Sequence, residues 1–378
     1  MKAFGLLVLI ISLFLLFSCE HDKLPLPTIP TGEEQFANVG EEVFIQISPV
    51  LDASLGSEYA FNNPSDVFFG ADNLLYLCDT GNNRIVVMDA GGAIQGISQN
   101  IPHPEAISQN DSLELLIVNK SNSIFEIDLV KYGHDIGSAP VEIVYSQQSE
   151  PSRQFTGISV HNGFEYYVTV IDTADSSLNT QAFSFIYDFN ANHTLKGPLP
   201  LFVNGTGLYS AIVPTGIVSL RERYLDISSL EVTPAFYFCQ KGETSLLRNN
   251  FKVQGTTTTI IEGTEVMIPN ISLIGTELYG VGQYYFPEDV TIDRSGFIFV
   301  VERGRPLNDP DTTKALPGFY RFAPSGVKLQ EVRGLGNGVG QFNEPKGVAV
   351  LPFPGAQITY ISDSGNNRVL MFRLSTDL

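Results

Sequence analysis

A six-residue pattern near the start of the chain returns almost unchanged near its end. It reads DTGNNR at Asp79–Arg84 and DSGNNR at Asp363–Arg368, and apolar runs flank both copies. A proline followed by a variable, a small and an apolar residue precedes each copy, at Pro64–Val67 and Pro345–Val348. Two copies of so detailed a pattern, about 280 positions apart, indicate an internally repeated fold.

The hexapeptide itself predicts a tight turn between two strands. Gly81 accepts positive φ angles without cost, and Asn83 tolerates the left-handed region better than most residues. The leading Asp79 can accept hydrogen bonds from turn amides and pair with Arg84. Because turn chemistry accounts for every residue, we interpret the motif as structural rather than catalytic.

The proline step marks six repeat starts along the chain, with Phe155 replacing proline in the third. They are spaced by about 40 to about 70 residues, which suits four-stranded blades with loop insertions. Residues 256–283 leave room for further strands, so a seventh blade there stays an alternative. The six starts are Pro64–Val67, Pro104–Ile107, Phe155–Ile158, Pro214–Ile217, Pro287–Val290 and Pro345–Val348.

The last repeat lacks an outer strand, because only four residues follow its third strand at Val369–Leu374. The alternating segment Glu42–Ser48 precedes the first repeat and belongs to none. If it supplies the missing strand, the ring closes and no sheet edge is left open. The sequence therefore predicts an all-β, six-bladed β-propeller of four-stranded antiparallel blades, with the N-terminal strand completing the last blade.

The best-preserved segments resemble NHL repeats. These are the start at Pro345–Val350, the turn at Asp363–Val369 and the lead-in at Gly340–Asn343, and the match is specific in repeats one, five and six. The resemblance implies a six-bladed propeller of a kind that commonly serves as a binding module. The corresponding turn at Val301–Arg305 departs from the pattern and carries an insertion.

The first 40 residues predict a membrane-anchoring leader. An apolar run follows Met1 and Lys2 and is shorter than the roughly 20 residues that span a bilayer. Its end at Leu16–Cys19 resembles a bacterial lipobox, which implies cleavage before Cys19 and lipidation of that residue.

A proline-rich stretch then leads into the repeats and favours an extended tether. We therefore divide the chain into a signal peptide (1–18), a lipid-anchored tether (19–40) and the propeller (41–378). The predicted location is the bacterial cell envelope, anchored by lipid, in the outer membrane.

Charge and cysteine content narrow the range of partners. The net charge of −19, from 41 acidic and 22 basic residues, disfavours nucleic acid as a partner. Cys78 and Cys239 lie within apolar strand segments and are interpreted as small buried residues rather than a disulfide pair.

The channel mouth of a propeller is the expected ligand site, because the first strand of each blade lines the channel. Small residues predominate at the third position of the repeat starts, as close approach of the inner strands requires. Asp66 and Asp289 interrupt that series and, with Glu105 and Glu288, could form a ring of four carboxylates suited to Ca²⁺. Alternatively, these carboxylates cap neighbouring turn amides. The second positions are Ser65, Glu105, Thr156, Thr215, Glu288 and Lys346, and the third are Asp66, Ala106, Gly157, Gly216, Asp289 and Gly347.

We expect a non-catalytic binding or scaffolding module for a protein, peptide or glycan. The candidate ligand contacts are Glu105, Glu288, Lys346, Arg303 and Arg305, of which the two arginines open an insertion at 303–317. The alternative is a metal-dependent propeller enzyme, similar to lactonases or to amidating lyases, that uses the carboxylate ring.

No cofactor other than possible calcium is indicated. The amidating lyases hold zinc through histidines from several blades. Here the histidines outside the tether do not recur at equivalent repeat positions, and we interpret them as loop residues. They are His103, His134, His161 and His193.

Overall fold

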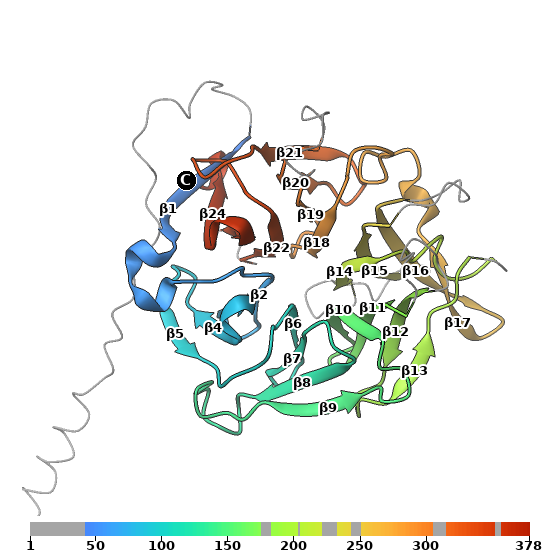
Figure 1. Ribbon diagram of the computed structural model, residues 1–378. Helices are drawn as coiled ribbons and strands as arrows, with labels where there is room; N and C mark the ends of the chain where they lie inside the picture. Colours follow the sequence, from blue (N-terminus) through green and yellow to red (C-terminus); the bar gives the residue numbers. More distant parts are fainter. Residues whose placement is uncertain are drawn as a thin grey trace, which may run out of the picture.

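Six four-stranded antiparallel sheets are arranged in a ring around a central channel (Figure 1). The computed structural model describes residues 42–174, 183–202, 205–220, 233–242, 251–304, 315–351 and 357–378. The predicted six-bladed propeller is confirmed. The predicted signal peptide, tether and Cys19 lie outside the described residues. Within the described ranges, no helix is long and apolar enough to cross a membrane.

Each of the first five blades uses four consecutive strands, from the channel outward. The first blade contains β2 (Val67–Phe69), β3 (Leu75–Asp79), β4 (Arg84–Met88) and β5 (Ile94–Ile97). The second contains β6 (Ala106–Gln109), β7 (Glu114–Val118), β8 (Ser123–Asp128) and β9 (Glu142–Ser146). The third contains β10 (Arg153–His161), β11 (Glu165–Asp172), β12 (Ser184–Phe189) and β13 (Leu195–Pro198).

The later blades follow the same order until the last. The fourth contains β14 (Pro214–Ser219), β15 (Thr233–Gln240), β16 (Val253–Ile261) and β17 (Thr264–Pro269). The fifth contains β18 (Pro287–Ile292), β19 (Ile298–Glu302), β20 (Gly318–Phe322) and β21 (Lys328–Arg333). The sixth contains β22 (Pro345–Val350), β23 (Thr359–Asp363), β24 (Arg368–Leu374) and β1 (Phe44–Leu51). Short 3-10 helices occur at Ala53–Leu55, Ser57–Tyr59, Thr80–Asn82, Ile271–Leu273, Ser364–Asn366 and Ser375–Asp377.

The ring closes as predicted, because the first strand of the chain, β1, and the last three strands, β22 to β24, form one blade (Figure 1). Strand β1 pairs antiparallel with β24, so that Phe44 lies opposite Leu374 and Ile47 opposite Met371. Strand β1 buries the side chains of Ile45, Ile47 and Leu51 in the core. It extends to Leu51, three residues beyond the expected end. The alternative of a seventh blade is not realised, because β16 and β17 complete the fourth blade.

The hexapeptide is a structural turn, as interpreted from the sequence. The buried Asp79 carboxylate accepts hydrogen bonds from the Asn62 amide at 2.8 Å and from Arg84 Nε at 2.7 Å. Asn83 adopts left-handed backbone angles, with φ 55°. The second copy repeats this arrangement, and its Asn367 side chain accepts a hydrogen bond from the Asn63 amide at 2.7 Å. That contact joins the last blade to the first.

The fourth and fifth blades have the same arrangement of hydrogen bonds, formed by other side chains. Glu302 takes the place of Asp79, and its buried carboxylate accepts backbone hydrogen bonds from Tyr285, Phe286 and Gly304 at 2.8–2.9 Å. In the fourth blade Gln240 accepts one from Ile212 at 2.8 Å. A buried polar side chain at the end of the second strand therefore secures the segment that leads into its own blade.

The hydrophobic core lies between neighbouring blades rather than at one centre. The cluster between the first and last blades combines Leu77 and Val86 with Tyr360 and Met371. Cys78 and Cys239 are buried and unbridged, as interpreted from the sequence. The inner strands thus stand packed side by side, with their starts forming the channel mouth.

Candidate functional site

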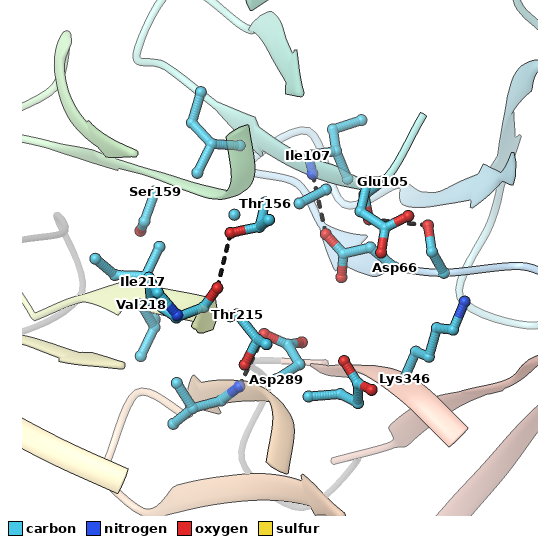
Figure 2. Close-up of a pocket in the computed structure, with 18 of the residues that line it drawn as sticks. Asp66, Glu105, Ile107, Thr156, Ser159, Thr215, Ile217, Val218, Asp289 and Lys346 are labelled. Carbon is cyan, nitrogen blue, oxygen red and sulfur yellow. Dashed lines mark hydrogen bonds between the residues drawn. The ribbon is translucent and has the colours of Figure 1, made fainter. Parts of the chain in front are cut away.

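A cavity of about 140 Å³ opens where the six inner strands begin. All six blades contribute side chains to it, and five of the predicted site residues are among them (Figure 2). The channel mouth thus gathers residues that the repeat starts had suggested as a set. These five are Asp66, Glu105, Glu288, Asp289 and Lys346.

Three blades use the second position of the repeat start to bind the next blade. A hydroxyl group there donates a hydrogen bond to the carbonyl oxygen of the proline that begins the following blade. These bonds run from Ser65 to Pro104 (3.1 Å), from Thr156 to Pro214 (2.8 Å) and from Thr215 to Pro287 (2.9 Å). In the other three blades the position holds Glu105, Glu288 and Lys346, which place charges at the rim of the cavity.

The third position is small because the inner strands approach closely, as predicted. A Cβ atom on Gly216 would lie 2.3 Å from Oδ1 of Asp289, and one on Gly347 would lie 2.7 Å from the Asp66 Cα. Each aspartate therefore occupies space that a neighbouring glycine leaves open. The spacing of the strands thus determines which blades can carry a carboxylate here.

Asp66 and Asp289 fasten neighbouring inner strands together. Asp66 accepts hydrogen bonds from the amide of Val67 at 2.7 Å and from that of Ile107, in the second blade, at 2.9 Å. Asp289 repeats this arrangement between the fifth and sixth blades, with amides at 2.8 and 3.0 Å. Both carboxylates thus take the amide-capping role that was the alternative to a metal site.

The two aspartates also hold protons more tightly than ordinary carboxyl groups. Burial raises the pKa of Asp289 to about 7, and the charge of Glu288 adds to the effect while backbone amides oppose it. Burial, reinforced by the charge of Asp289, raises the pKa of Asp66 well above its usual range. Asp289 therefore supplies an acid or base group close to neutral pH, and Asp66 keeps its proton to a higher pH than a free aspartate does.

The two glutamates are engaged in ion pairs. Glu105 pairs with Lys120, and Oε2 of Glu288 lies 2.5 Å from Nζ of Lys241. Within the described part of the chain, no three or more His, Cys, Asp or Glu residues come together in a way that could hold a metal ion. With amides on two carboxylates and lysines on the other two, this donor set does not fit a divalent cation.

Lys120 and Lys241 were not found from the sequence, although a signal for them exists. Lys241 follows Gln240, the last residue of β15, and Lys120 follows Asn119, the first residue after β7, so both take the place of Thr80 in the hexapeptide. Aligning the six turns instead of the six starts gives Thr80, Lys120, Thr173, Lys241, Arg303 and Ser364. Three cations at one repeat position would have indicated a charged channel mouth.

Arg303 and Lys346 differ in how their charges are compensated. Nη2 of Arg303 lies 2.7 Å from the carboxylate of Glu344, on the rim. Nζ of Lys346 donates to Oδ1 of Asn63 at 3.3 Å, and no carboxylate of the described residues lies within ion-pair distance of it. Burial lowers the pKa of Lys346; the charges of Glu105 and Glu288 oppose this shift, and those of Lys120 and Lys241 add to it. The predicted contact Arg305 lies outside the described residues.

The histidines lie away from the cavity. His103, His134 and His193 occupy loop positions with positive φ, as expected. The expectation of a loop residue is wrong for His161, which is the last residue of β10. Its buried ring stacks on Tyr167, and its Nε2 lies 3.2 Å from Oδ1 of Asp188, so the side chain is held inside the blade. None of the four lines the channel cavity.

Comparisons with known proteins show the fold. No family model and no curated protein sequence matches the chain. A gluconolactonase structure from Xanthomonas campestris aligns with a TM-score of 0.53 and 10% identity, over 93% of this chain and 95% of that one. A putative gluconolactonase gives 0.54 and 9%, over 92% and 94%. A Bacteroides thetaiotaomicron protein of unknown function gives 0.54 and 10%, over 89% and 77%. The shared propeller is established at these identities, whereas membership of the NHL family remains a resemblance.

Proposed function

We propose that the protein binds a compact organic anion in its channel cavity. The observation that carries this proposal is Lys346, a partly buried cation at the rim without a carboxylate partner among the described residues. A cation removed from water is costly unless an anion compensates it. The neighbouring cations Lys120, Lys241 and Arg303 already have carboxylate partners. One anionic group of a ligand would complete the set.

The size and lining of the cavity support a small ligand. A volume of about 140 Å³ is too small for a folded partner or an extended glycan, which would need another surface. Phe68, Ile158 and Val218 line the same cavity and give its wall an apolar part. We therefore infer a short molecule with a charged end at the mouth and carbon atoms inside, and keep a macromolecular partner as a separate proposal for the outer surfaces.

Replacing Lys346 with Met is expected to lower the affinity for small carboxylates about 10- to 100-fold. The change removes a charge-assisted interaction of roughly 1.5–3 kcal/mol while keeping a long side chain. Isothermal titration calorimetry with a panel of short mono- and dicarboxylates measures it, using the tightest binder of the unsubstituted protein. The matched control Lys131→Met alters an exposed lysine and should leave the affinity unchanged. Equal affinities of both variants, or no carboxylate binding at all, would contradict the proposal.

A second candidate function is hydrolysis of a lactone, and the Asp289 carboxyl favours it. Its pKa of about 7 lets it act as a general base near neutral pH. In this reading Asp289 accepts a proton from the water that attacks the lactone carbonyl, and returns that proton to the ring oxygen as the ring C–O bond breaks. The ammonium of Lys346 stabilises the oxyanion and the carboxylate product. The fold shared with a gluconolactonase supports the candidate. No metal enters these steps, because the donor set does not fit one.

If Asp289 is the base, the rate of lactone hydrolysis rises with pH through about 7 and then levels off. The rate rises with pH because only the deprotonated carboxylate accepts a proton, and burial together with the charge of Glu288 disfavours that form until the pH reaches about 7. Asp289→Asn should lower the rate about 100-fold or more. A pH-rate profile of a lactone panel, with circular dichroism to confirm folding, measures both. A flat profile, or full activity in Asp289→Asn, would contradict this function.

We also propose, from the sequence, that the propeller is anchored to the bacterial envelope through lipid on Cys19. Cells that express the full chain should incorporate labelled palmitate into it, and Cys19→Ala should abolish the label and move the protein into the soluble fraction. The control Cys78→Ala alters a cysteine buried in the core and should keep the label. Labelling that persists in Cys19→Ala would exclude this anchor.

A further inference from the structure

Glu288 has one carboxylate oxygen without a hydrogen-bond partner. Its side chain is 8% exposed, and its Oε2 lies 2.5 Å from Nζ of Lys241. Its Oε1 is buried, and no atom of the described residues forms a hydrogen bond to it. Nη1 of Arg303 lies 3.9 Å from Oε1, beyond hydrogen-bond distance. Half of this carboxylate is therefore removed from water without a donor.

Glu105 provides the contrast within the same site. It occupies the same repeat position as Glu288, lines the same cavity and pairs with a lysine in the same way. Neither of its oxygens is among the buried atoms that lack a partner. Because a buried charged acceptor is normally satisfied, the unpartnered oxygen of Glu288 indicates a donor that arrives with a ligand.

The surroundings of that oxygen favour an uncharged donor. Lys241 and Arg303 both place positive charge beside the Glu288 carboxylate. An ammonium group entering the same space would be repelled by both cations, whereas a hydroxyl or amide N–H would not. Lys346 and Glu288 both line the cavity of about 140 Å³, so one small molecule can reach both residues.

We propose that the bound anion carries a neutral hydrogen-bond donor on the carbon next to its carboxylate, and that this donor binds Oε1 of Glu288 while the carboxylate pairs with Lys346. The inference rests on the proposed anion site and names its ligand class: short carboxylates with an adjacent hydroxyl or amide N–H. Glu288 is the residue that selects them, and Lys346 is the residue that holds any carboxylate.

Three probes of equal skeleton test this selection: propionate, lactate and alanine, which differ only in carrying hydrogen, hydroxyl or ammonium on the second carbon. Calorimetric titration should show lactate binding about tenfold to a hundredfold more tightly than propionate, as expected for a hydrogen bond to a charged acceptor. Alanine should bind no more tightly than propionate. N-formylglycine tests the amide form of the donor and should also exceed propionate.

Substitutions at Glu288 and Glu105 test the contact with the donor independently of anion binding by Lys346. Glu288→Met should reduce the lactate-to-propionate ratio to about one, while the matched Glu105→Met should leave the ratio as in the unsubstituted protein. If Glu288→Met does not fold, Glu288→Gln keeps the shape and should lower the ratio severalfold. Equal binding of lactate and propionate by the unsubstituted protein would overturn the donor while leaving the anion site in place. If alanine binds most tightly, the donor of the ligand is charged and not neutral. If none of the probes binds, both proposals are wrong.

Discussion

Removing residues 42–51 is expected to cost the propeller most of its folding free energy. Strand β1 buries Ile45, Ile47 and Leu51, each 2% exposed or less. At about 1.5–3 kcal/mol for each side chain, the loss is roughly 5–9 kcal/mol. Domains of ordinary stability have only about 5–15 kcal/mol in total. The deletion also leaves β24 as an unpaired edge that can associate with other chains.

Urea unfolding followed by circular dichroism measures this loss, and light scattering detects the association. Single substitutions calibrate it: Ile47→Ala should cost about 2–4 kcal/mol, whereas Ile143→Ala, at a side chain that is 62% exposed, should cost little. A synthetic peptide of residues 42–51 should restore part of the lost stability. A shortened chain that unfolds at the same urea concentration as the full one would show that β1 does not close the ring.

The second large effect is expected for Asp363→Ala, at about 3–5 kcal/mol of unfolding free energy. The fully buried carboxylate accepts hydrogen bonds from the Asn343 amide, from Asn366 Nδ2 and from Arg368 Nε, all at 2.7–2.8 Å. Its removal leaves the guanidinium of Arg368 buried without its counter-ion. The cost therefore exceeds that of the lost hydrogen bonds alone.

A double substitution tests this explanation. Asp363→Ala combined with Arg368→Met should be more stable than Asp363→Ala alone, because the second change removes the uncompensated charge. Glu142→Ala, at an exposed position of β9, serves as the control and should unfold like the original protein. If the double variant is less stable than Asp363→Ala, the buried charge is not the source of the loss.

The fold could be predicted because its regular parts depend on local backbone chemistry. Asn83 and Asn367, at left-handed positions, identify blades one and six without knowledge of their neighbours, and the prolines of the repeat starts do the same for blades one, five and six. The third strand of the last blade was expected at Val369–Leu374, and β24 lies at Arg368–Leu374. Strands β16 and β17 were harder to assign to a blade, because the wide spacing between the fourth and fifth repeat starts allowed either a longer fourth blade or an additional blade.

The sequence predicted five residues of the candidate site, but it did not predict which atoms they contact. The repeat starts placed Asp66 and Asp289 at the channel mouth, since residues at one repeat position share one height in the ring. Their hydrogen bonds go to amides of the following blade, at Ile107 and Val348. Those contacts depend on how adjacent blades are set against each other, which no local pattern encodes. The sequence alone therefore left the two aspartates free to bind a metal ion, whereas in the structure both accept hydrogen bonds from backbone amides.

The hydrogen bond from Lys346 to Asn63 has a consequence for how the ring withstands opening. Lys346 belongs to β22 of the last blade, and Asn63 belongs to the segment that leads from β1 into the first blade. Because the chain runs without a break from β1 to β2, the one place where the ring is not closed covalently lies inside the last blade, between β1 and β24. Only non-covalent contacts resist separation there, and the bond from Lys346 to Asn63 is one that opening of the ring would break. An anion held by Lys346 would sit beside this bond, so occupancy of the channel and the mechanical integrity of the ring share a residue.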